Sequence, residues 1–149
     1  MFLERFNVVM KAVEIMNYRW YTNILKYPFA VAGGLIIRAR RGDVGGPTLE
    51  IIGLPPNQHY REIEFESYVF SNDETYPYCD IKAVYNENEN AVYFVISGKD
   101  AAGYILSELH CLDISNFTVE GIASFSEIPL LAYDKLNKSV YVIGYYIEL

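Results

Sequence analysis

Two stretches of this chain align without gaps 48 positions apart. Residues 83–96 read AVYNENENAVYFVI, and residues 131–144 read LAYDKLNKSVYVIG. Each stretch places alternating apolar and aromatic residues on both sides of a short polar segment, which is the pattern of a strand, a turn and a second strand. The sequence therefore predicts two equivalent β-hairpins, with strands near 81–86 and 91–97 and at 130–134 and 139–147, and with turns centred near Asn88 and Leu136. It also predicts that Tyr93 and Tyr141 are at least half buried, at matching places in their sheets.

Strand signals also dominate the rest of the chain from residue 28 onward. Further strands are predicted at 35–38, 49–52, 62–70, 104–112 and 118–125. A repeat near 48 residues is typical of the four-stranded blades of β-propellers. We therefore expect a mainly β fold, with antiparallel sheets in propeller-blade-like repeats of about 48 residues over 28–149. A β-sandwich or barrel is the alternative.

The N-terminal residues 1–27 have a different pattern. Apolar residues recur there at steps of three and four, as in an amphipathic helix: Phe2, Phe6, Val9, Val13 and Met16. The alternative is a strand at 18–21 that pairs with 29–32. With 149 residues in total, the chain is expected to form a single domain, 1–149, with this segment attached to the β region.

The composition limits the classes of partner and compartment. The net charge of −7 argues against nucleic-acid binding, because phosphate backbones repel an acidic chain. The longest apolar run, 29–37, is too short to insert across a membrane. Cys79 and Cys111 do not form a disulfide framework and no signal peptide is recognisable, so we expect a reducing, cytoplasmic location. An apolar content of 52% favours a protein partner or self-association.

Three segments of the chain together resemble a kelch repeat. They are residues 92–100, 106–113 and 116–122. In that family an apolar strand ends in a glycine pair, and here Ser97-Gly98 takes its place. A later strand carries an aromatic anchor, and Phe117 or Val119 stands near that position.

The resemblance implies a function as an interaction platform, because kelch propellers commonly bind other proteins. It covers one full unit and half of the next. Propellers usually close with four or more blades, so this chain has too few for a ring. The resemblance therefore implies a fragment, an open array, or a subunit completed by association.

No sequence motif for catalysis or metal binding is recognisable, so no catalytic residue, metal or cofactor is predicted. His110 and Cys111 are neighbours on one strand, so their side chains should point to opposite faces and should not share a metal. The candidate binding residues are the basic cluster Arg38, Arg40 and Arg41, together with His59.

Each candidate binding site has an alternative interpretation. Guanidinium groups bind carboxylates and phosphates, so the arginine cluster predicts a site for an anion or an acidic peptide. The alternative is an edge strand that is protected by charge. His59 lies in a loop after Pro55-Pro56, where it would either bind a ligand or simply face solvent.

Three functions follow from these observations. The first is a non-catalytic protein-interaction or scaffold module with kelch-like blades. The second is a carbohydrate-processing enzyme or sugar-binding module, with His59, Asp73 and Glu74 as its residues. The third is a structural or assembly subunit, suggested by the apolar composition and the incomplete ring.

Overall fold

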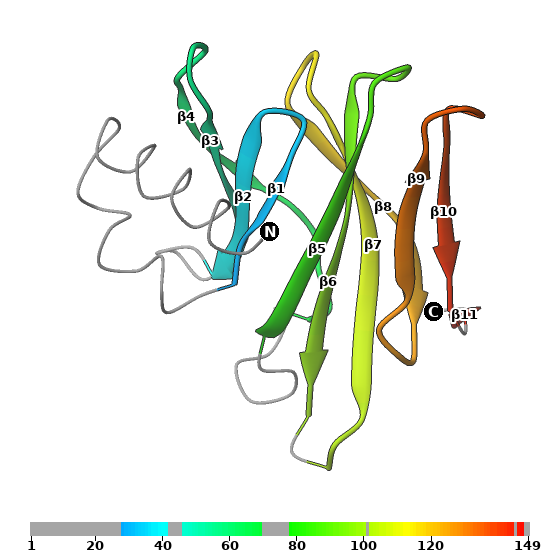
Figure 1. Cartoon of the computed structure of the whole chain (residues 1–149). Helices are drawn as coiled ribbons and strands as arrows, with labels where there is room; N and C mark the ends of the chain where they lie inside the picture. Colours follow the sequence, from blue (N-terminus) through cyan, green and yellow to red (C-terminus); the bar gives the residue numbers. More distant parts are fainter. Residues whose placement is uncertain (1–27, 42–45, 70–77, 101, 145, 148–149) are drawn as a thin grey trace.

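The described part of the chain is built from antiparallel β-sheets (Figure 1). The computed structural model of the chain describes residues 28–41, 46–69, 78–100, 102–144 and 146–147. The helix or strand predicted within 1–27 lies outside these residues. Within them there is no helix, and hence none that could cross a membrane.

Within the described residues, eleven strands form three sheets. Sheet A has the order β1-β2-β3-β4, with bounds Ala30–Ala32, Leu35–Arg41, Pro47–Gly53 and Tyr60–Glu64. Sheet B has the order β11-β8-β7-β6-β5; from β5 to β8 the bounds are Tyr78–Asn86, Ala91–Lys99, Ile105–Asp113 and Thr118–Phe125, and β11 is Tyr146–Ile147. Sheet C is the pair β9 (Leu130–Asp134) and β10 (Ser139–Ile143).

The two aligned stretches form hairpins with the same strand register, as predicted. In β5–β6 the pairs are Ala83↔Phe94, Val84↔Tyr93, Tyr85↔Val92 and Asn86↔Ala91. In β9–β10 they are Leu131↔Val142, Ala132↔Tyr141, Tyr133↔Val140 and Asp134↔Ser139. Each pair recurs 48 positions further along the chain. The repeat in sequence is therefore a repeat in strand pairing.

Three hairpins share one loop geometry. The loops at 87–90, 114–117 and 135–138 each hold their last residue at positive φ: Asn90, Phe117 and Lys138, between 51° and 53°. The residue before each loop is Asn or Asp, and its side-chain oxygen accepts a hydrogen bond from the backbone N–H two residues on, at 3.1, 2.8 and 2.9 Å. Such Asx turns fix the start of a hairpin loop, so Asn86, Asp113 and Asp134 have the same role.

Sheet B lies between the other two sheets. One of its faces packs on sheet A, with Phe94, Ile96 and Leu112 against Ile37 and Ile51. Strands β1 and β5 lie next to each other, and so do β5 and β9. Thus the first strands of the three sheets are neighbours.

The opposite face of sheet B packs on sheet C. Val95, Leu109 and Phe125 contact Leu131 and Val142 there. Strand β6 is apolar along most of its length because both of its faces are covered.

Most predicted strands differ from the structure by a few residues at their ends, and two differ more. The strand predicted at 62–70 is β4, Tyr60–Glu64, because the chain then leaves the sheet and buries Phe65 and Val69 in the core between sheets A and B.

The second error is at the C-terminal end, where a single strand was predicted at 139–147. It is broken into β10 and β11 at Gly144, where a side chain would meet Pro129 at 2.9 Å. After this bend β11 pairs with β8.

Candidate functional site: the loop face

Five hairpin loops lie along one edge of the molecule, the upper edge in Figure 1. We call this edge the loop face. It consists of residues 33–34, 54–59, 87–90, 114–117 and 135–138. Loops that a rigid sheet positions are where proteins most often place binding residues.

Hydrogen bonds join these loops to one another. The backbone N–H of Leu54 donates to the carbonyl oxygen of Gly34 at 2.8 Å, which links the β3–β4 loop to the β1–β2 turn. The N–H of Ile114 donates to the carbonyl oxygen of Asn90 at 3.1 Å, and the Asn90 amide donates to Ser115 Oγ at 3.4 Å. Within sheet A and within sheet B, the loops of neighbouring hairpins are therefore held in fixed relative positions.

His59 lies on the loop face and contacts a loop of sheet B. Its ring meets the ring of Phe117 edge-on, with centroids 5.4 Å apart, and the Arg61 guanidinium lies 4.2 Å from the centroid of the same Phe117 ring. Burial, and then the positive charge of Arg61, lower the pKa of His59, so its imidazole is neutral at neutral pH.

Gly53 explains how the loop places His59. The Gly53 N–H donates to the His59 carbonyl oxygen at 2.9 Å, and a Cβ at residue 53 would lie 2.6 Å from the imidazole ring. Only a residue without a side chain allows the loop to fold back this closely. His59, Arg61 and Phe117 together offer an aromatic and cationic surface that could bind a carboxylate or an aromatic side chain of a partner.

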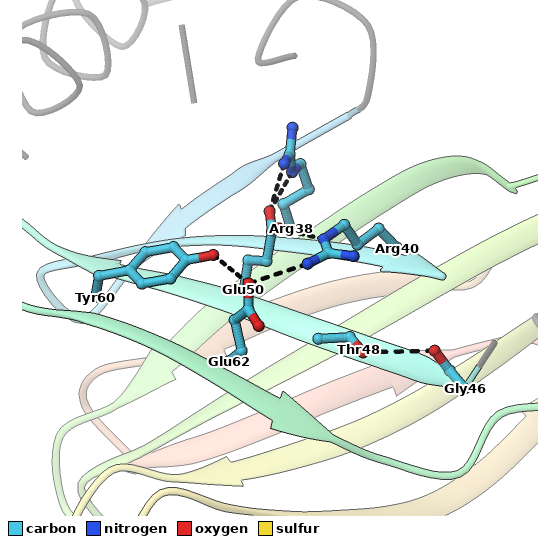
Figure 2. Close-up of polar contacts among 7 residues, drawn as sticks. All are labelled: Arg38, Arg40, Gly46, Thr48, Glu50, Tyr60 and Glu62. Carbon is cyan, nitrogen blue, oxygen red and sulfur yellow. Dashed lines mark hydrogen bonds and ion pairs between the residues drawn. The ribbon is translucent and has the colours of Figure 1, made fainter. Parts of the chain in front are cut away.

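Arg38 and Arg40 lie elsewhere, on the face of sheet A turned away from sheet B. Figure 2 shows both guanidinium groups converging on Glu50. Arg38 Nε donates to Glu50 Oε2 at 2.7 Å, and Arg40 Nε donates to Oε1. Glu62 extends the cluster by accepting hydrogen bonds from Arg40 at 3.0 Å and from the Tyr60 hydroxyl at 2.5 Å.

This arrangement comes from the register of three neighbouring strands. Arg38 pairs with Glu50 and Glu50 pairs with Glu62, so the three side chains share one face. Their strand neighbours Leu49, Ile51 and Ile63 point the other way, into the core. The alternative of a solvated, charged edge was wrong for Arg38, which is only 3% exposed, although β1 pairs with β2 at Leu35–Ile37 and not along the arginines.

The arginine cluster holds carboxylates of its own chain. Burial would lower the pKa of Arg40, but the hydrogen bond and the charge of Glu50 raise it, so the guanidinium stays charged. Binding of an external anion by Arg38 and Arg40 stays a prediction. The Arg41 side chain lies outside the described residues. The structure does not bring His59 to this cluster, because His59 lies in the loop before β4 and packs on Phe117 of sheet B, the side on which Arg61 also lies and Glu62 does not.

A second polar cluster surrounds Glu108 inside the molecule. Glu108 accepts hydrogen bonds from the Ser67 hydroxyl and, at 2.7 Å, from the Tyr68 backbone N–H. His110 Nε2 lies 3.6 Å from the carboxylate, beyond hydrogen-bond distance, so this contact is electrostatic. The His110 ring stacks on Phe94 with centroids 5.2 Å apart. Glu108 therefore anchors the segment after β4 onto sheet B.

No sequence pattern predicted this cluster, because Ser67 and Glu108 are 41 residues apart in the chain and meet only through packing. Ser67 bonds to the carboxylate rather than to His110, so the three side chains do not form a nucleophile–base pair. His110 pairs with Phe94 and Cys111 with Tyr93, so the two neighbours point to opposite faces as predicted. In the part of the chain that the structure describes, no group of three His, Cys, Asp or Glu side chains could hold a metal ion.

Glu108 should make stability depend on pH. Burial alone would raise the pKa of Glu108, but the nearby His110 imidazole, together with hydrogen bonds from Ser67 and the Tyr68 N–H, outweighs burial and lowers it. A carboxyl whose pKa is lower in the folded state stabilises the fold above its ordinary pKa, and this stabilisation is lost as the pH falls through the folded value. We expect Glu108→Gln to destabilise the protein at neutral pH by about 1–3 kcal/mol.

The measurement is urea unfolding over a pH series from neutral to acid. The gap in unfolding free energy between the natural protein and Glu108→Gln should narrow as the pH falls. Two parallel stability curves would show that the ionised Glu108 carboxylate contributes no stability.

The remaining candidates lie outside the described residues. Asp73 and Glu74, which the sugar-enzyme hypothesis requires together with His59, fall in the range 70–77. In comparisons with known proteins, no protein family, no curated protein and no solved structure matches this chain.

Proposed function

We propose that this chain is a non-catalytic protein-interaction module built from kelch-like propeller blades, and that a protein partner binds its loop face. The observation that carries the proposal is the set of hairpin loops on one edge: hydrogen bonds join the loops within sheet A and within sheet B, and the ring contact of His59 with Phe117 links the two sheets. A preformed surface loses little conformational entropy when it binds a partner.

The arrangement of the three sheets supports the blade part of the proposal. In a propeller, four-stranded antiparallel sheets repeat around a central axis, with the first strand of each sheet nearest that axis. Here sheets A, B and C pack face to face, and their first strands β1, β5 and β9 are neighbours. Sheet C would then be half of a third blade. One departure is β11, which pairs with β8 of sheet B rather than extending sheet C.

The chemistry of the polar residues supports a binding role over a catalytic one. Glu50 and Glu108 both have their carboxylates engaged by groups of the same chain. On the loop face, in contrast, the central residues of the loops are exposed, as Asn88 and Leu136 are. A reducing, cytoplasmic location belongs to the same proposal, and Cys111 is a free thiol.

Site-specific photo-cross-linking in cells tests the proposal. A benzophenone amino acid replaces Asn88 on the loop face, and in a matched control it replaces Tyr104, which is 72% exposed in the β6–β7 loop at the other end of the hairpins. We expect the Asn88 position to give a discrete cross-linked protein and the Tyr104 position to give none. Equal cross-linking at both positions, or none at Asn88, would contradict a partner at the loop face.

A further inference from the structure

Sheet C leaves an apolar face exposed on the side turned away from sheet B. Leu131 and Val142 point toward sheet B, so the alternate residues of the two strands point outward. These are the register pairs Leu130↔Ile143 and Ala132↔Tyr141. Leu130 is 65% exposed, Ile143 64% and Tyr141 47%. We call Leu130, Ala132, Tyr141 and Ile143 the outer face of sheet C.

The internal repeat shows what covers such a face in this protein. Positions 48 residues earlier are Lys82, Val84, Tyr93 and Val95. They form the face of sheet B on which sheet C packs, and Val95 is only 1% exposed there. The equivalent face of sheet B is therefore covered by the apolar inner side of a two-stranded β-hairpin, sheet C.

The exposed copy of this face is more apolar than the covered copy. Leu130 stands where the covered face has Lys82, and Ile143 stands where it has Val95. None of the four outer-face residues is charged, so two such faces can meet without like-charge repulsion, although the chain carries −7 overall. Contiguous exposed apolar residues of this kind mark interaction surfaces.

We propose that the outer face of sheet C is a self-association surface, by which two copies of this chain pack sheet C on sheet C about a two-fold axis. In a second copy the inner side of sheet C is already packed on its own sheet B, so the apolar hairpin face that it can present is its own outer face of sheet C. A two-fold axis brings the same patch from both copies together and leaves neither patch exposed. The loop face stays free in this arrangement, so the proposal stands independently of a partner there.

The test is the molecular mass in solution. At about 50 µM, well above a micromolar dissociation constant, light scattering coupled to size exclusion should give twice the chain mass of 17.1 kDa. Leu130→Glu and Ile143→Glu should each raise the dimer dissociation constant at least about 100-fold, because they place like charges opposite each other in a desolvated interface. Leu136→Glu is the matched control, since Leu136 is 90% exposed in the β9–β10 loop and not on the outer face.

A mixing experiment shows whether the outer faces of two copies contact each other directly, or whether a substitution prevents dimerisation by changing the fold elsewhere. Leu130→Glu and Leu130→Lys should each be monomeric alone, and an equimolar mixture should form heterodimers. Circular dichroism confirms folding of each variant, and Tyr141→Ser replaces any variant that does not fold. A monomeric natural protein, an unchanged dimer in Leu130→Glu and Ile143→Glu, or a mixture that stays monomeric would overturn the proposal.

Discussion

Glu50→Ala should destabilise the protein by about 3–5 kcal/mol, because it leaves two arginines beside an empty position in a buried site. Arg38 and Glu50 are 3% and 4% exposed, and the carboxylate bonds to both Arg38 and Arg40. Water cannot readily replace the lost carboxylate there, so the cost is that of uncompensated buried charge. Because small domains are stable by about 5–15 kcal/mol, this change should remove a large share of the stability. Urea or guanidinium unfolding measures it.

The matched control is Glu62→Ala in the same cluster. The Glu62 side chain is 40% exposed and bonds to Arg40 at 3.0 Å, so solvent screens this pair and its removal should cost less than about 1 kcal/mol. Equal losses for the two variants would show that the burial of Glu50 has no special consequence. A loss below about 1 kcal/mol for Glu50→Ala would mean that the buried ion pair is not a stabilising element.

Phe94→Ala should cost about 3–5 kcal/mol, the usual range for truncating a fully buried aromatic side chain. Phe94 is 0% exposed and lies between sheets A and B. Its ring stacks on His110 and meets the Phe65 ring edge-on, with centroids 6.3 Å apart. The variant therefore removes the contact with His110 within sheet B and the contact with Phe65 from the segment after β4. It leaves a cavity between sheets A and B.

Chemical denaturation of Phe94→Ala is compared with Tyr104→Ala, an aromatic truncation at a residue that is 72% exposed. The control should change the unfolding free energy by less than about 0.5 kcal/mol. If Phe94→Ala changed the unfolding free energy as little as Tyr104→Ala, sheets A and B would not share a packed core in solution.

The sequence repeat predicts which residues are equivalent, but it does not predict how buried they are. Tyr93 and Tyr141 occupy the same register position, and both were expected to be at least half buried. Both residues are at least half buried, as predicted, but sheet C packs on Tyr93, whereas Tyr141 is 47% exposed on the outer face of sheet C. The extent of burial depends on which sheet packs on the hairpin, and this information is not contained in the alternation of a single hairpin.

Local patterns predicted the hairpins well because turn residues and strand alternation act over a few positions. The residue types of Asn86 and Asp134 alone predict that a loop follows each of them. The contacts that assemble the candidate site could not be predicted in this way. Glu50 meets Arg38 and Arg40 through the pairing of β2 with β3, and His59 meets Phe117 across two sheets. Both depend on register and on how sheets pack, which a single sequence does not specify.

The shared loop geometry has a consequence for engineering. In each of the three hairpins, the backbone path is set by the Asn or Asp before the loop and by the positive φ of its last residue. The three residues between these points, 87–89, 114–116 and 135–137, differ in sequence from loop to loop, apart from the Asn that the last two loops share at their third position. They are therefore interchangeable cassettes, and new recognition sequences could be grafted at any of the three sites without redesigning the strands beneath.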